Sequence, residues 1–82
     1  MRTSPAWDEH TIPAGLRRRH RLGAHTWGVI VVSEGALRLI MTPSISVDLT
    51  RGSHGPAIPP DVEHHVEAQG HVVFSIDFYT VD

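Results

Sequence analysis

A strict alternation of apolar and polar side chains near the end of the chain constrains the fold more than any other feature of the sequence. Every second residue from 72 to 78 is valine, phenylalanine or isoleucine, and Ser75 and Asp77 stand between them. Successive side chains of a β-strand point to opposite faces of a sheet. The pattern therefore predicts a strand over residues 71–81 with one buried face. Together with Trp27 and Leu37, that face is expected to supply the largest core side chains: Val72, Phe74, Ile76 and Phe78.

Shorter segments of similar character precede this strand and are separated by turns that contain glycine or proline. Alternation or β-branched residues predict strands over residues 16–21, 25–33, 36–41 and 45–49. We expect Glu34-Gly35 to form a tight turn that joins the second and third of these strands into a hairpin. No segment has a convincing helical period. Strands at this spacing are typical of a small barrel or sandwich, with residues 1–82 as a single domain.

The composition excludes several classes of function. Without cysteine the chain has no disulfide framework, zinc ribbon or thiol nucleophile. Four of its seven basic residues cluster at Arg17, Arg18, Arg19 and Arg21, but no aromatic residues alternate with them as a nucleic-acid platform would require. No apolar segment is long enough to cross a membrane, and the first residues lack the apolar core of a signal peptide. We therefore expect a cytoplasmic protein that binds neither nucleic acid nor membranes.

Seven histidines in 82 residues are the least usual feature of the composition. Alternation places His64 on the inward face after the rigid Pro59-Pro60 turn, and His65 on the outward face unless a bulge exchanges them. By the same argument His20 and His25 point inward from the first half of the chain. Neutral imidazoles that converge in this way would bind zinc, iron, copper, nickel or manganese. A core histidine with a hydrogen-bond partner is the alternative interpretation of His64. The remaining histidines are expected on exposed loops: His10, His54 and His71.

No familiar catalytic motif is present, so no catalytic residue is assigned. The sequence lacks a Gly-x-Ser-x-Gly elbow and a phosphate-binding glycine loop. Asp77 lies between apolar residues in a predicted strand, where a carboxylate needs a compensating partner. We expect an ion pair with Arg18 or Arg38, and leave open whether Asp77 or His65 joins the metal site.

Two sets of short motifs resemble one known family. The first set is Leu16-Arg17-Arg18-Arg19-His20, Gly23, Thr26-Trp27-Gly28 and Val32-Ser33-Glu34-Gly35. The second is Ile58-Pro59-Pro60, His64-His65-Val66-Glu67 and Phe74-Ser75-Ile76-Asp77-Phe78-Tyr79. Together they resemble the TehB/YeaR-like domain, a small cupin-related family associated with tellurite resistance.

The resemblance implies an antiparallel β-barrel of the cupin (double-stranded β-helix) type, with a metal or ligand pocket between its two motifs. His20 and His64 match histidine positions of the family, whereas His25 is not a position associated with it. Counting back from Gly35, the glutamate of a full first cupin motif would fall on Gly28.

These observations predict a mononuclear site for a divalent transition metal, with His20 and His64 as ligands and His25 as the third. The protein would then be a small metal-binding cupin that acts, as a dioxygenase, isomerase or redox enzyme, on an unidentified small molecule. The alternative is a non-enzymatic stress-response module that binds a metal, an oxyanion or a small molecule. A purely structural domain is a third interpretation. Because one small barrel has a thin core and open edges, we also expect a homodimer, with Trp7 packed across its interface.

Overall fold

Two long antiparallel strands, β3 and β5, form the centre of the computed structural model, which describes residues 1–41, 44–53 and 55–80. They pair from Thr26 opposite Thr80 to Met41 opposite His64. The sheet order is β1-β5-β3-β4, every pairing is antiparallel, and β2 also pairs with β5. In chain order the elements are β1 (Arg2–Thr3), β2 (Trp7–Asp8), the 3-10 helix η1 (Ala14–Arg17), β3 (Thr26–Met41), β4 (Ile45–Thr50) and β5 (His64–Thr80).

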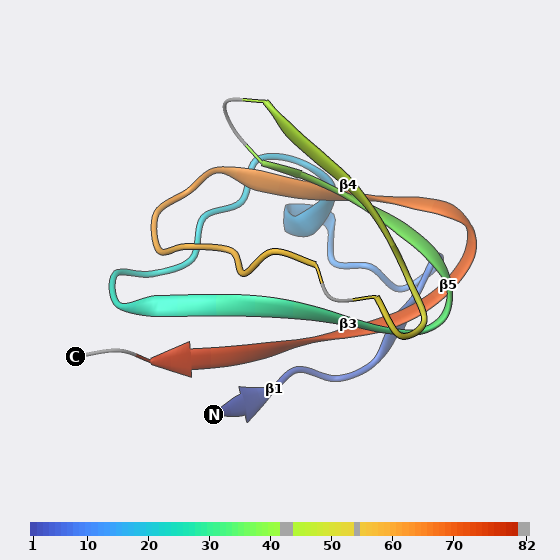
Figure 1. Cartoon of the computed structure of the whole chain (residues 1–82), viewed down its shortest axis with the longest axis horizontal. Helices are drawn as coiled ribbons and strands as arrows, with labels where there is room; N and C mark the ends of the chain where they lie inside the picture. The colour runs from blue at the N-terminus through green and yellow to red at the C-terminus, as the bar shows by residue number, and fades with distance from the viewer. Residues whose placement is uncertain (42–43, 54, 81–82) are drawn as a thin grey trace.

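A bulge in β3 replaces the hairpin turn that the sequence predicts at Glu34-Gly35. The register with β5 shifts between Val32 and Glu34 and again between Gly35 and Leu37, but the strand continues. Gly35 has a φ of 73°, which suits a bulge as well as a turn. The hairpin prediction is therefore wrong. At the bulged region the two long strands bend, so that the halves of the sheet lie over one another as two layers (Figure 1).

The space between the layers holds the hydrophobic core. The alternation predicted for β5 is confirmed, because Val72, Phe74 and Ile76 are buried and Phe78 packs against them. Leu37 is also fully buried, as expected. Trp27 is not a core residue, since 37% of its surface is exposed on the outer face of β3. The register shift explains this, because the buried positions of β3 are even-numbered before the bulge and odd-numbered after it.

The sheet is not closed into a barrel, so the expected barrel closure is wrong although the antiparallel all-β prediction is confirmed. Within the described residues the edge strands β1 and β4 do not pair with one another. Isolated bridges extend the sheet between Gly28 and Ile58 and between His20 and His64. A barrel would need a strand that joins the two edges of the sheet. In the described part of the chain none does so, because β1 is only two residues long and residues 16–21 do not form the predicted strand.

Residues 14–17 form the 3-10 turn η1 in place of the predicted strand. The backbone N–H of Leu16 donates to the carbonyl of Pro13 at 3.0 Å, and the Leu16 side chain is buried. The neighbouring arginines are exposed. Arg17 donates to the carbonyl of Glu9, and Arg21 to that of Asp61, so these two arginines fasten surface loops.

The segment before η1 is held on the sheet by Trp7. Its ring lies 5.7 Å from that of Phe74, tilted by 59°, within the same chain. The homodimer, with Trp7 at its interface, stays a prediction. No helix among the described residues is long and apolar enough to cross a membrane.

Candidate functional site

A backbone bridge at the start of β5 brings His20 and His64 together. The N–H of His20 donates to the carbonyl of His64 at 2.8 Å, and the N–H of His64 donates to the carbonyl of His20 at 2.9 Å. Residues opposite one another in such a bridge place their side chains on the same face. The rings accordingly meet edge to face, with centroids 5.1 Å apart, and Nδ1 of His20 lies 3.3 Å from Nε2 of His64.

The surroundings of His64 determine its protonation state. Only 2% of its surface is exposed, and Nδ1 lies 3.0 Å from the carbonyl of Val62. A carbonyl only accepts, so Nδ1 carries the proton and Nε2 of the neutral ring has a lone pair. Burial lowers the pKa of His64 below its usual value, and the charges of His20 and His65 lower it further against the opposing effect of the Val62 hydrogen bond. His64 is thus held neutral, with Nε2 directed at His20.

The distance between the two ring nitrogens matches that of two ligands on one transition-metal ion. Two nitrogens bound to one tetrahedral zinc ion at about 2.0–2.1 Å lie about 3.3 Å apart. The separation of His20 Nδ1 from His64 Nε2 has that value. Histidine ligands usually donate their second ring N–H to a carbonyl or carboxylate, as His64 does to Val62. The pair can also exist without metal, with His20 Nδ1–H donating to His64 Nε2.

The structure does not bring the other candidate residues to this pair. His25 is exposed and has a φ of 67° in the turn before β3, and its role as third ligand stays a prediction. Within residues 1–41, 44–53 and 55–80, no three histidine, aspartate or glutamate side chains are placed to hold one metal ion. His65 is half-buried on the other face of β5. His10 and His71 are exposed, as predicted, although His71 lies within β5 and not on a loop. His54 lies outside the described residues.

Asp77 does not form the predicted ion pair. Its carboxylate accepts a hydrogen bond from the hydroxyl of Thr3 at 2.7 Å. Arg38 instead pairs with Asp48 at 2.8 Å, across β3 and β4. That prediction is wrong because the pairing of β1 with β5 supplies a hydroxyl that periodicity could not reveal.

A small cavity of about 180 Å³ adjoins His20. Its walls are apolar, and the imidazole of His20 is its most polar group. The lining residues are Trp7, Pro13, Leu16, His20, Ile76 and Phe78. The cavity depends on η1 and on β2, neither of which the sequence pattern predicts as such.

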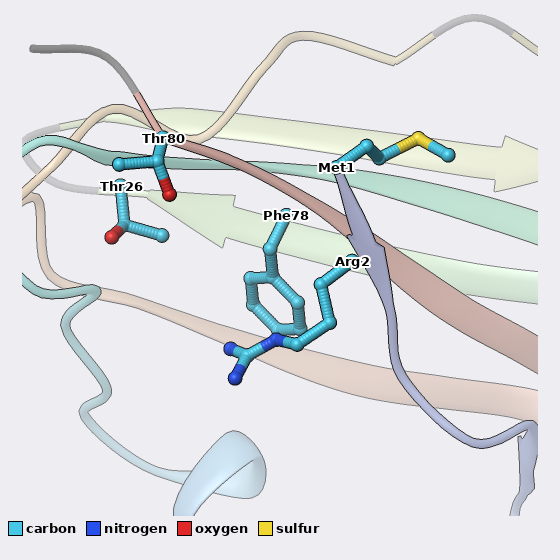
Figure 2. A pocket seen from close by; sticks show the side chains of 5 residues that line it. All are labelled: Met1, Arg2, Thr26, Phe78 and Thr80. Carbon is cyan, nitrogen blue, oxygen red and sulfur yellow. The ribbon is translucent and has the colours of Figure 1, made fainter.

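A second, larger cavity of about 360 Å³ lies at the end of β1 (Figure 2). Phe78 lines both cavities. Arg2 lies over the Phe78 ring, with the guanidinium carbon 4.8 Å from the ring centroid. Sequence reasoning missed Arg2, because nothing in a polar first segment indicates that it pairs with β5.

Comparison with solved structures finds close agreement in fold. TehB from Haemophilus influenzae superposes with a TM-score of 0.86 at 25% identity, and the match covers 95% of this chain and 29% of TehB. A protein from E. coli strain K12 gives a TM-score of 0.87 at 24% identity over 100% of this chain and 89% of its own. A cupin-2 domain protein from Shewanella frigidimarina gives 0.61 at 24% identity, covering 77% of this chain and 58% of that one.

No curated protein matches the chain. The family comparison is more informative, because the TehB-like domain matches residues 2–76, which is most of the chain and contains both His20 and His64. The similarity to the cupin-2 domain protein indicates that the open, two-layered sheet is related to the cupin fold. The chain belongs to the TehB-like domain family.

Proposed function

We propose that this chain binds a divalent transition-metal ion between Nδ1 of His20 and Nε2 of His64, next to a cavity that accepts a small molecule. The observation that carries the proposal is the 3.3 Å separation of the two nitrogens, with the tautomer of His64 fixed by Val62. The membership of the TehB-like domain family adds to it, because both histidines lie within the matched residues.

The protein would supply two ligands and leave the remaining coordination positions to water or to a bound molecule. Open positions of this kind allow a metal ion to bind a substrate or ligand directly. His20 also lines the apolar cavity of about 180 Å³. This volume is below the roughly 300 Å³ at which drug-sized sites begin, so the cavity suits a molecule of few atoms.

Gly28 explains why a third, carboxylate ligand is not expected from the cupin pattern. A Cβ at Gly28 would lie 3.0 Å from the Leu22 side chain and 3.4 Å from that of Ile76. Core side chains occupy the space that a glutamate would need. A site with two histidines binds metal more weakly than a full cupin site, which favours reversible binding of a metal and a small molecule. Turnover of the bound molecule is the second candidate, and the apolar cavity that His20 lines is the observation in its favour.

Zinc titration of protein purified without a histidine tag tests the proposal. We expect His20→Ala and His64→Gln each to weaken zinc binding by more than about 10-fold, since each removes a direct ligand. His65→Ala is the matched control, because His65 follows His64 on the same strand but points to the other face. It should leave the affinity unchanged. If all three variants bind zinc equally well, the two histidines do not form the site.

A further inference from the structure

The larger cavity combines a cation, two hydroxyls and an aromatic face on the inner side of the sheet. β1 pairs with β5 so that Arg2 is opposite Phe78, and β3 pairs with β5 so that Thr26 is opposite Thr80. Phe78 and Thr80 continue the face of β5 that carries the buried Ile76. Figure 2 shows Arg2 alongside the Phe78 ring, with the two threonines at the other side of that ring. Three strands therefore contribute to one cavity of about 360 Å³.

The guanidinium of Arg2 is positioned by Phe78, and no carboxylate of the described residues neutralises it. Its carbon lies 4.8 Å from the centroid of the Phe78 ring, within the range of a cation–π contact. Within the described ranges, the N–H groups of this guanidinium donate no hydrogen bond to a protein acceptor. Over the described part of the chain, no carboxylate forms an ion pair with Arg2, whereas Arg19, Arg21 and Arg38 all have one.

The remaining lining favours a negatively charged ligand. The cavity residues are Met1, Arg2, Thr26, Phe78 and Thr80, and none of them is acidic. The planar fork of an arginine binds a carboxylate through two parallel hydrogen bonds, and the threonine hydroxyls can donate as well. The side chains of Phe78 and Met1 provide an apolar wall for a non-polar portion of the ligand. The volume is within the range of small-molecule sites.

We propose that this cavity is a binding site for a small organic carboxylate, held by the guanidinium of Arg2 and by the hydroxyls of Thr26 and Thr80. Its apolar portion lies against Phe78. The site is separate from the His20–His64 pair, although Phe78 forms a wall shared with the cavity beside His20. Carboxylate binding therefore does not require a metal ion.

An NMR titration of metal-free, ¹⁵N-labelled protein in the presence of a chelator tests this site without testing the metal proposal. Benzoate is the probe, and sodium phosphate and sodium chloride at matched ionic strength are the comparison arms. We expect saturable shifts of the Thr26 and Thr80 amides and of the Arg2 Nε–H with benzoate. Phosphate should bind more weakly, since it has no apolar portion, and chloride should give no saturable change.

Two variants and one control decide the assignment. Arg2→Met keeps an unbranched side chain over Phe78 but removes the charge and the donors, and it should weaken benzoate binding by at least about 10-fold. Thr26→Val removes a hydroxyl from a β-branched side chain and should weaken binding several-fold. Arg51→Gln removes an exposed arginine from the turn after β4 and should have no effect. Undiminished binding by Arg2→Met, equal binding of phosphate, or the absence of saturable shifts with benzoate would each overturn the proposal.

Discussion

His64 and His71 lie on the same strand, β5, and their surroundings move their pKa values in opposite directions. Burial lowers the pKa of His64, so that its ring stays neutral beside His20. His71 is exposed, and a hydrogen bond to the carboxylate of Glu9 raises its pKa, so that its ring is charged more readily. The comparison shows that the environment, and not the residue type, makes one histidine a possible ligand and the other a partner in an ion pair.

The exposed pair of His71 and Glu9 supports the His20–His64 pair through the first segment of the chain. Glu9 accepts hydrogen bonds from the backbone N–H of Val72 at 3.1 Å and from Nδ1 of His71 at 3.0 Å. The Val72 N–H, the N–H of Glu9 itself and His71 together lower the pKa of Glu9 to about 2. These contacts tie the segment that carries Trp7 to β5, and Trp7 lines the cavity beside His20. The two regions therefore differ in chemistry but depend on the same strand.

The largest effect is expected at the bulge in β3, where Gly35 lies against the backbone of His71 on β5. Gly35 and Gly52 both have positive φ values, of 73° and 82°, so alanine is strained at either position. A Cβ at Gly35 would also overlap the carbonyl oxygen of His71, whereas nothing lies within 4 Å of one at Gly52. Gly52→Ala should lower the free energy of unfolding by about 1 kcal/mol, and Gly35→Ala by about 3 kcal/mol or more.

Urea unfolding monitored by circular dichroism measures both losses. In Gly35→Ala the displaced His71 should also lose its contact with Glu9, which the histidine ring resonances would report. Equal losses from the two substitutions would mean that the bulge does not hold His71 where the structure places it.

A smaller effect is expected in the dependence of stability on pH. The unfolded chain protonates a histidine below about pH 6.5, whereas buried His64 resists protonation, so the stability that comes from neutral His64 is lost as pH falls below that value. His71 acts in the opposite direction. Its contribution is fully present below about pH 6.5 and is lost as pH rises through its raised pKa.

His64→Gln and His71→Gln separate these two contributions. Relative to the parent protein, His64→Gln should reduce the loss of stability on acidification, and His71→Gln should increase it. Urea unfolding of metal-free protein at several pH values on both sides of about 6.5 measures the difference. If the free energies of unfolding of both variants depend on pH in the same way as that of the parent, the two rings do not have opposite roles.

Local pattern predicted much of β5 and little of what surrounds it. Alternation indicated that Phe74 and His64 are buried. In a strand with one covered face, every second side chain points into the core. Glu34-Gly35 was misinterpreted because a glycine with positive φ serves a turn and a bulge equally well. Arg2 and Glu9 acquire their partners from residues far along the chain, through the pairing of β1 and β2 with β5.

The candidate site was likewise predictable only where local pattern determines the position of a side chain. The sequence indicated His20 and His64 individually, but the backbone bridge that places their nitrogens 3.3 Å apart is a contact between distant segments. His25 was expected to follow the parity of β3, whereas its positive φ in the preceding turn leaves it exposed. Odd or even position along a strand predicts which side chains point inward only where the strand is continuous and in register.

The most direct test of the account is the tautomer of His64 and its response to metal. Long-range ¹H–¹⁵N correlation spectra of the metal-free protein at neutral pH should show His64 protonated at Nδ1 and unprotonated at Nε2. Addition of zinc should then shift Nε2 of His64 and Nδ1 of His20 together, with the resonances of His71 and His65 unchanged. If His64 carries its proton on Nε2, or if zinc shifts neither ring of the pair, the His20–His64 pair is not the metal site.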